Sequence, residues 1–112
     1  MKSFRILVSG RVQGVNFRSM MKSYAEKDGL KGNVRNLDDG RVEIYAKCNE
    51  EEKDKLVDWL KSNPGFSKVQ DVKVDSVKGR VKMNGFEIIK EKSFLKDQGK
   101  SAKNFVKKLW IC

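Results

Sequence analysis

The sequence predicts an α+β fold in which a mainly antiparallel sheet carries two helices on one face. Three observations lead to this prediction. Short stretches alternate apolar and polar residues, two longer stretches place apolar residues at helical spacing, and turns rich in glycine or aspartate separate them. Along the 112 residues the order is strand, helix, strand, strand, helix, strand, followed by a short last strand.

A strand and a helix open the chain. Apolar residues at positions 4, 6 and 8 indicate a largely buried strand, and a polar turn with two glycines follows it. From Phe17 onward, apolar residues recur at positions 17, 20, 21, 24 and 25, which is the spacing of one helix face. Asp28-Gly29 ends this helix, because glycine readily takes the left-handed conformation that follows a helix C-terminus.

A hairpin comes next. Residues 30–37 form the second predicted strand, and Arg41–Cys48 forms the strand that returns beside it. The turn between them is Asp38-Asp39-Gly40, in which the Asp-Gly pair tolerates the positive φ angles of a tight hairpin.

The second helix has a clear start and stop. Asn49 is a good N-cap, the three acids that follow suit the positive end of a helix dipole, and Pro64-Gly65 ends the helix. Val69–Val77 and Phe86–Ile89 are the remaining strands. This order of elements is that of the ferredoxin-like βαββαβ sandwich.

The C-terminal end differs from the rest of the chain. We expect residues 1–90 to form one domain and residues 91–112 to form a basic extension, which contains six lysines. Its apolar residues recur at helical spacing, at Ala102, Phe105, Val106 and Leu109. The extension is therefore predicted to be a short basic amphipathic helix docked on the domain. A flexible or partner-binding tail, and an element for a membrane surface or nucleic acid, are the alternatives.

The composition limits which ligands the protein is expected to bind and which chemistry it can perform. A net charge of +10 and a pI of about 9.7 favour anionic ligands such as nucleic acid, anionic lipid or small phosphorylated compounds. The chain has no histidine, which excludes the commonest general base and metal ligand. Cys48 and Cys112 do not have metal-site spacing, so no metal or cofactor is expected. Free thiols are favoured, with a disulfide between them as the alternative.

Targeting signals are not evident. The stretch MKSFRILVSG is too short and too polar for a signal peptide, and no apolar run approaches the ~18 residues that a membrane span requires. We therefore expect a cytoplasmic protein, monomeric by default.

The stretch SGRVQGVNFRSMM, residues 9–21, has the features of an anion site. Gly10 and Gly14 bracket a polar turn that enters a helix, where unpaired backbone N–H groups and the helix dipole favour an anion. Glycine lets the backbone curve into a concave nest, and Arg18 can add a bidentate guanidinium contact. The alternative is a simple glycine turn beside a surface arginine. The stretch lacks the P-loop and dinucleotide motifs, so a small phosphate group is predicted rather than a nucleotide.

A second motif, GNVRN at residues 32–36, precedes the hairpin. Together with GRVQGVNFR at residues 10–18, it makes the chain resemble the acylphosphatases over about residues 3–90. The family's motifs have the forms GRVQGVxFR and GWVRN. Asn33 stands where an aromatic residue is usual, which bears on local packing, and Met21 stands where threonine is frequent, which bears on support for the site and on the rate.

The resemblance implies a βαββαβ sandwich that hydrolyses acyl phosphates to a carboxylate and inorganic phosphate without a metal. It assigns the catalytic roles to Arg18, which binds the phosphoryl group, and to Asn36, which orients the attacking water. It implies that the phosphate lies against the backbone of a loop whose members are Gln13, Gly14, Val15, Asn16, Phe17 and Arg18. Inorganic phosphate is then expected to inhibit as a product.

The reaction is compatible with a chain that has no histidine. An acyl phosphate expels a carboxylate, which is a stable anion and needs no general acid. Phosphoryl transfer depends mostly on positioning and on stabilising charge at the equatorial oxygens. The Asn36 amide can both accept from and donate to a water molecule. In the predicted topology, Asn36 and Arg18 are expected to meet at one end of the sheet.

Two residues within the motifs are expected to have ordinary structural roles. Strand alternation turns Arg35 away from Asn36, so Arg35 is expected to be a surface charge. Gln13 is expected to contribute its backbone N–H more than its side chain.

Rival functions are a non-catalytic phosphate-binding module and a nucleic-acid-binding module on the same fold. The second needs an aromatic pair on the central strands, and residues 41–48 offer Tyr45 alone.

Overall fold

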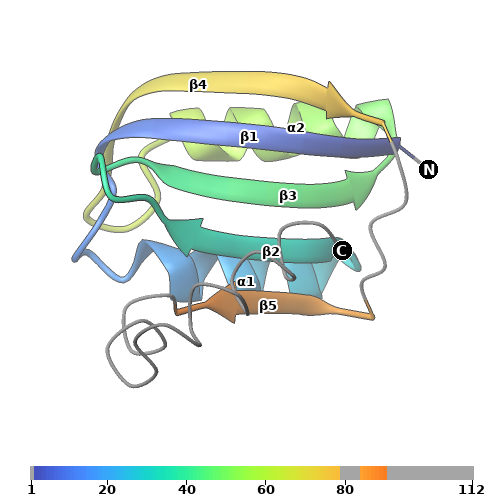
Figure 1. Cartoon of the computed structure of the whole chain (residues 1–112), viewed down its shortest axis with the longest axis horizontal. Helices are drawn as coiled ribbons and strands as arrows, with labels where there is room; N and C mark the ends of the chain where they lie inside the picture. The colour runs from blue at the N-terminus through green and yellow to red at the C-terminus, as the bar shows by residue number, and fades with distance from the viewer. Residues whose placement is uncertain (1, 79–83, 91–112) are drawn as a thin grey trace, which may run out of the picture.

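The computed structural model describes residues 2–78 and 84–90. These residues form five strands and two helices, arranged as in Figure 1, and the α+β fold predicted from the sequence is confirmed. In chain order the elements are β1 (Lys2–Arg11), α1 (Phe17–Asp28), β2 (Lys31–Asn36), β3 (Val42–Cys48), α2 (Glu50–Lys61), β4 (Lys68–Val77) and β5 (Phe86–Ile89).

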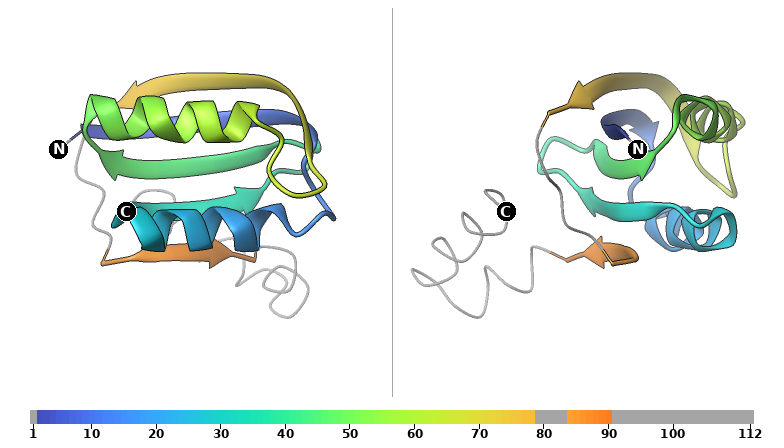
Figure 2. Two further views of the ribbon diagram at one scale, coloured as in Figure 1. Left: turned by 180° about the vertical axis from the view of Figure 1, so that it is seen from behind. Right: turned by 90° about the vertical axis from the view of Figure 1, so that its right-hand side faces the viewer.

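The five strands form one sheet in the order β4-β1-β3-β2-β5. β1 pairs antiparallel with β3 and β4, β2 pairs antiparallel with β3, and β5 pairs parallel with β2, so the sheet is mainly antiparallel as predicted. Figure 2 shows both helices on the same face, with α2 over the β4 side and α1 over the β5 side. The second face of the sheet has no helix of the described residues on it.

The hydrophobic core lies between the helices and the sheet. Its largest fully buried apolar side chains come from both layers: Ile6, Val8, Val34, Val42 and Ile44 from the strands, and Phe17, Met21, Leu56 and Leu60 from the helices. Full burial of one such side chain stabilises the fold by about 1.5–3 kcal/mol. The rings of Tyr24 and Trp59 stack with centroids 4.5 Å apart and link α1 to α2.

Two of the predicted helix ends, the start of α2 and the end of α1, are confirmed. Asn49 caps α2 in a capping box: its side chain accepts from the Glu52 N–H at 2.8 Å, and the Glu52 carboxylate accepts from the Asn49 N–H at 3.0 Å. Gly29 follows α1 in the left-handed conformation, and the Leu30 N–H donates to the Ala25 carbonyl at 2.8 Å. The start of α2 and the end of α1 therefore lie where local sequence chemistry places them, whereas α2 already ends at Lys61, before the predicted stop at Pro64-Gly65.

Gly10, the first glycine of the predicted turn, lies within strand β1 rather than in the turn. β1 continues through Gly10 to Arg11, and its register against β4 shifts between Ser9 and Gly10. Gly10 has φ 124°, and a Cβ at this position would lie 2.2 Å from the Lys68 carbonyl oxygen. Gly10 therefore lies opposite a β-bulge in β4, where the two strands approach closely, rather than on the rim of the phosphate loop.

The predicted helix within residues 91–112 lies outside the described residues, and so does Cys112. Cys48 is buried and carries a free thiol. Neither described helix is long and apolar enough to cross a membrane.

Candidate active site

The loop between β1 and α1 leads into an uncapped helix N-terminus. Gly14 has φ 74° and Asn16 has φ 62°, so both take the left-handed conformation just before α1 begins at Phe17. The Asn16 side chain makes no capping hydrogen bond, and the first turn of α1 contains no acidic residue. The positive end of this helix is therefore not neutralised by its own side chains, which suits an anion.

A pocket of about 290 Å³ lies at this helix start. Its lining comes from three separate parts of the chain: Val12, Gly14, Asn16, Phe17, Arg18 and Ser19 from the loop and α1, Asn36 from the end of β2, and Ile88 and Lys90 from the β5 region. Among these residues two are cationic and none is acidic. The pocket thus combines a cationic surface with an apolar part formed by Val12, Phe17 and Ile88.

Both residues predicted to be catalytic line this one pocket. Arg18 enters from the first turn of α1 and Asn36 from the last residue of β2, so the topology brings the two motifs together as expected. Of the loop residues predicted to hold phosphate, Gln13 and Val15 do not line the pocket, although their neighbours in the loop do.

Asn36 has an unusual hydrogen-bonding state. Its Oδ1 is buried and has no hydrogen-bond partner among the described residues. A buried acceptor without a partner costs about 1–3 kcal/mol, so most native structures satisfy such groups. Because Asn36 lines the pocket and no described residue holds this oxygen, a turn of the side chain would bring the oxygen to a molecule bound there.

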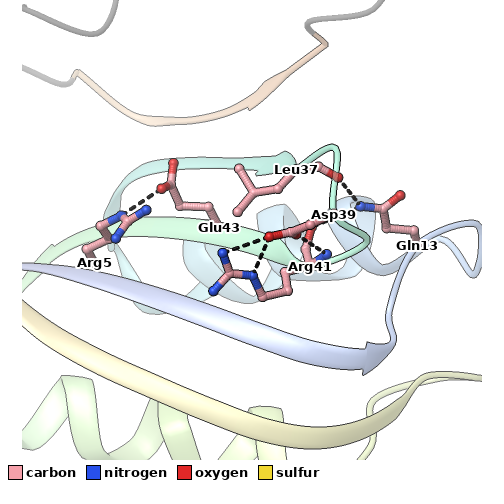
Figure 3. Close-up of polar contacts among 6 residues, drawn as sticks. All are labelled: Arg5, Gln13, Leu37, Asp39, Arg41 and Glu43. Atoms are coloured by element: carbon pink, nitrogen blue, oxygen red, sulfur yellow. Dashed lines mark hydrogen bonds and ion pairs between the residues drawn. The ribbon is translucent and has the colours of Figure 1, made fainter.

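The Gln13 side chain attaches the loop to the β2–β3 hairpin. Its Nε2 donates to the carbonyl oxygens of Leu37 at 2.8 Å and Arg41 at 2.9 Å. Figure 3 shows Gln13 reaching from the loop to Leu37, with the Asp39–Arg41 contact of the same hairpin beside it. The expectation that Gln13 acts mainly through its backbone therefore missed a structural use of its side chain.

Arg35 was expected to be a surface charge, and this expectation is wrong. Its side chain is 11% exposed, and its Nε donates to Glu43 at 2.8 Å. Arg5 donates to the other carboxylate oxygen of Glu43 at 2.7 Å (Figure 3), which raises the pKa of the Arg5 guanidinium. Arg35 and Glu43 are direct cross-strand partners, so pairing between β2 and β3 brings the two charges together and buries them.

Glu43 was not singled out from the sequence. Its side chain is fully buried, although it lies between Val42 and Ile44, whose side chains fill the core on the opposite face. A usable signal was present: an acid inside an apolar strand, with arginines on two other strands. Without the register, however, the sequence cannot assign the partners.

The fold and the pocket define a small ferredoxin-like protein with a cationic site where its first strand meets its first helix. Comparison with known proteins identifies the particular group. A family model described as "Acylphosphatase" matches residues 4–88. The acylphosphatase of Alkalilimnicola ehrlichii is 46% identical over 88 residues, which cover 79% of this chain and 98% of that protein.

Solved structures agree with this assignment. The crystal structure of acylphosphatase from Bacillus subtilis superposes with a TM-score of 0.75 at 41% identity and covers 80% of this chain and 100% of that chain. The acylphosphatase structure from Coxiella burnetii gives a TM-score of 0.72 at 31% identity, covering 79% and 92% of the two chains. The chain therefore belongs to the acylphosphatase family, and the predicted family, fold and class of enzyme are confirmed.

Proposed function

We propose that the pocket lined by Arg18 and Asn36 is the active site in which this chain hydrolyses the carboxyl-phosphate bond of an acyl phosphate. Family membership supports the reaction. The observation that carries the assignment to this pocket is the unpartnered Asn36 Oδ1, which shares a cationic pocket with Arg18.

The loop and the start of α1 bind the phosphoryl group. The Arg18 guanidinium provides charge and a planar fork of donors that matches two phosphoryl oxygens. Backbone N–H groups of residues 13–18 supply further donors, and the uncapped N-terminus of α1 adds its dipole. These groups are fixed before the reaction starts, so they stabilise charge on the equatorial oxygens without reorganising.

Asn36 orients the nucleophile. Its Oδ1 accepts a hydrogen bond from the attacking water, whose oxygen forms the new bond to phosphorus. The bond from phosphorus to the acyl oxygen breaks, and its electron pair leaves with the carboxylate. The proton lost by the water passes to the phosphate product. The side chains in these steps bind and orient, and none has to titrate near neutral pH.

Hydrolysis of benzoyl phosphate in the presence of a chelator tests the proposal. Wild type is expected to turn over and to be inhibited by inorganic phosphate. Arg18→Ala should lose both turnover and phosphate affinity, whereas Asn36→Ala should lose turnover and keep phosphate affinity nearly intact, because orienting water is not binding phosphate. Arg11→Ala is the matched control, since it removes an exposed arginine of β1 that does not line the pocket.

The roles would be wrong if both pocket variants lost phosphate affinity equally, or if neither lost rate. A folded wild type that binds phosphate without turnover would indicate the non-catalytic phosphate-binding module instead.

Three finer expectations belong to the same proposal. Inorganic phosphate occupies the cradle as a product inhibitor, and the chain acts as a monomer in the cytoplasm. Light scattering behind size-exclusion chromatography tests the monomeric state.

A further inference from the structure

We infer that Gln13 is a positioning residue that keeps the phosphate loop and Asn36 at a fixed separation through its side-chain amide. The inference deepens the proposed function and rests on it. The two proposed catalytic residues reach the pocket from distant parts of the chain, Arg18 from the loop and α1 and Asn36 from the end of β2. Gln13 lies in the same loop as the first part without lining the pocket, and its side chain contacts the hairpin that begins just after Asn36.

The contact lies one residue from Asn36. Gln13 Nε2 donates to the carbonyl oxygen of Leu37, the residue that follows Asn36, at 2.8 Å. The same nitrogen donates to the Arg41 carbonyl at 2.9 Å, and this carbonyl also accepts the Leu37 N–H at 2.8 Å. The amide therefore bridges the two sides of the hairpin at the point where β2 ends, and a shift of the loop is transmitted to the backbone beside Asn36.

The chemistry of this contact selects glutamine. Both acceptors are carbonyl oxygens, so the bridge needs a neutral group with two hydrogens on one atom, which a side-chain amide provides. Methionine has nearly the same shape but no donor. Glutamate would place carboxylate oxygens against two carbonyl oxygens and repel them. Asparagine has the amide but is one methylene shorter.

Positioning matters here because the reaction uses no side chain that titrates. If Asn36 only orients water, its contribution depends on the distance between that water and the phosphoryl group, and a misplacement of about 1 Å can cost about 10²-fold in rate. A shift between the loop and Asn36 should change phosphate affinity less than the rate. Arg18 and the loop belong to one continuous segment and would move together.

A double-mutant cycle tests the inference with benzoyl phosphate as substrate and inorganic phosphate as inhibitor. Gln13→Met is expected to lower kcat about 10–100-fold and to change the phosphate inhibition constant by less than about 3-fold. In the Asn36→Ala background, Gln13→Met should lower kcat by less than about 2-fold further, because the residue through which it acts is gone. Gln13→Glu should lose at least as much rate as Gln13→Met.

Asp39→Ala is the matched control. It removes the carboxylate that accepts from the Arg41 N–H and guanidinium, but it does not remove the Gln13 acceptors, which are backbone carbonyls. It should keep kcat within about 2-fold of wild type. If Gln13→Met fails to fold, Gln13→Asn is measured in the same cycle, because it retains the amide and shifts it by one methylene.

Three outcomes would overturn the inference. Gln13→Met could keep the wild-type kcat, it could weaken phosphate binding in proportion to the rate, or it could lower kcat by the same factor with and without Asn36. Loss of rate in Arg18→Ala and Asn36→Ala alongside a fully active Gln13→Met would overturn this inference alone. Full activity of Asn36→Ala would overturn the proposed role of Asn36, and the inference with it.

Discussion

Glu43 in β3 and Asn36 in β2 both bury side-chain oxygens, but the two groups differ in what those oxygens contact. Each carboxylate oxygen of Glu43 accepts a hydrogen bond from an arginine, one from Arg5 and one from Arg35. Asn36 Oδ1 accepts none from the described residues. The two groups are close in the sheet, because Asn36 pairs with Val42, the residue just before Glu43 in β3.

This difference in hydrogen bonding suggests that Glu43 has a structural role and Asn36 a functional one. A buried charge without partners would cost several kcal/mol, and Glu43 avoids this cost because two guanidinium groups hold its carboxylate. A buried neutral acceptor costs less, so a fold can tolerate one where a ligand completes it. In this sheet the paired group joins three strands, and the unpaired group lies at the pocket.

The largest expected effect comes from breaking the paired group. Glu43→Ala leaves two guanidinium groups without their carboxylate and should lower the free energy of unfolding by about 3–5 kcal/mol. A loss of about 3 kcal/mol is favoured, because the Arg5 side chain is 36% exposed and water can hydrate it. Urea unfolding measures the loss, and Glu50→Ala, which removes an exposed carboxylate paired with Lys2 and Lys53, is the control. A loss below about 1 kcal/mol would show that Glu43 is not a structural anchor.

The unpaired group should behave in the opposite way. Asn36→Ala is expected to lower kcat about 10²–10³-fold, the range seen when one oriented transition-state contact is removed. The free energy of unfolding should change by less than about 1 kcal/mol, or rise, because the substitution removes a buried acceptor that has no partner. Urea unfolding beside the rate assay checks both. A large loss of stability would mean that Asn36 is a structural residue.

The contrast between these two groups also shows what the sequence could predict. Alternation, glycine turns and capping residues are local signals, and they located the elements, the Asn49 cap and the motifs that carry Arg18 and Asn36. Arg35 was misassigned because alternation predicts which face of a strand a side chain takes, but it does not predict what lies across from it. The Arg35–Glu43 contact depends on cross-strand register, which is a property of the assembled sheet.

The same reason applies at Gln13 and Gly10. The Gln13 amide contacts carbonyls of a hairpin that is distant in the sequence, and Gly10 is needed where β1 meets β4. Both were read as parts of a local turn because their partners are not local. Turn chemistry is visible in the sequence, whereas close approach between strands becomes visible once the strands are paired.

A smaller effect is expected from comparing the two arginines that hold Glu43. Arg35 is 11% exposed and Arg5 is 36% exposed. Arg35→Met should lower the free energy of unfolding by about 2–3 kcal/mol, and Arg5→Met by about 1 kcal/mol, because water can replace the more exposed guanidinium. Urea unfolding of both variants at equal ionic strength measures the difference. Equal losses would mean that solvent exposure does not separate the two contacts.

The smallest effect is expected at Cys48. Its buried thiol lies at the opposite end of β3 from Glu43. Burial raises the pKa of its thiol from 9.0 to about 11. The unfolded chain therefore releases this proton as the pH passes 9 while the folded chain keeps it, so the stabilisation is fully present below pH 9 and is lost between pH 9 and 11. Cys48→Ala removes this dependence and leaves the other titrating groups in place.

The measurement is urea unfolding of wild type and Cys48→Ala, with reductant, at pH 8 and pH 10. At pH 8 wild type should be the more stable, because the alanine leaves a small cavity in the core. At pH 10 the gap should be smaller by about 1 kcal/mol, since one pKa unit corresponds to about 1.4 kcal/mol. An unchanged gap would mean that the folded chain lets the thiol ionise near its ordinary pKa, and hence that water reaches Cys48 at this end of β3.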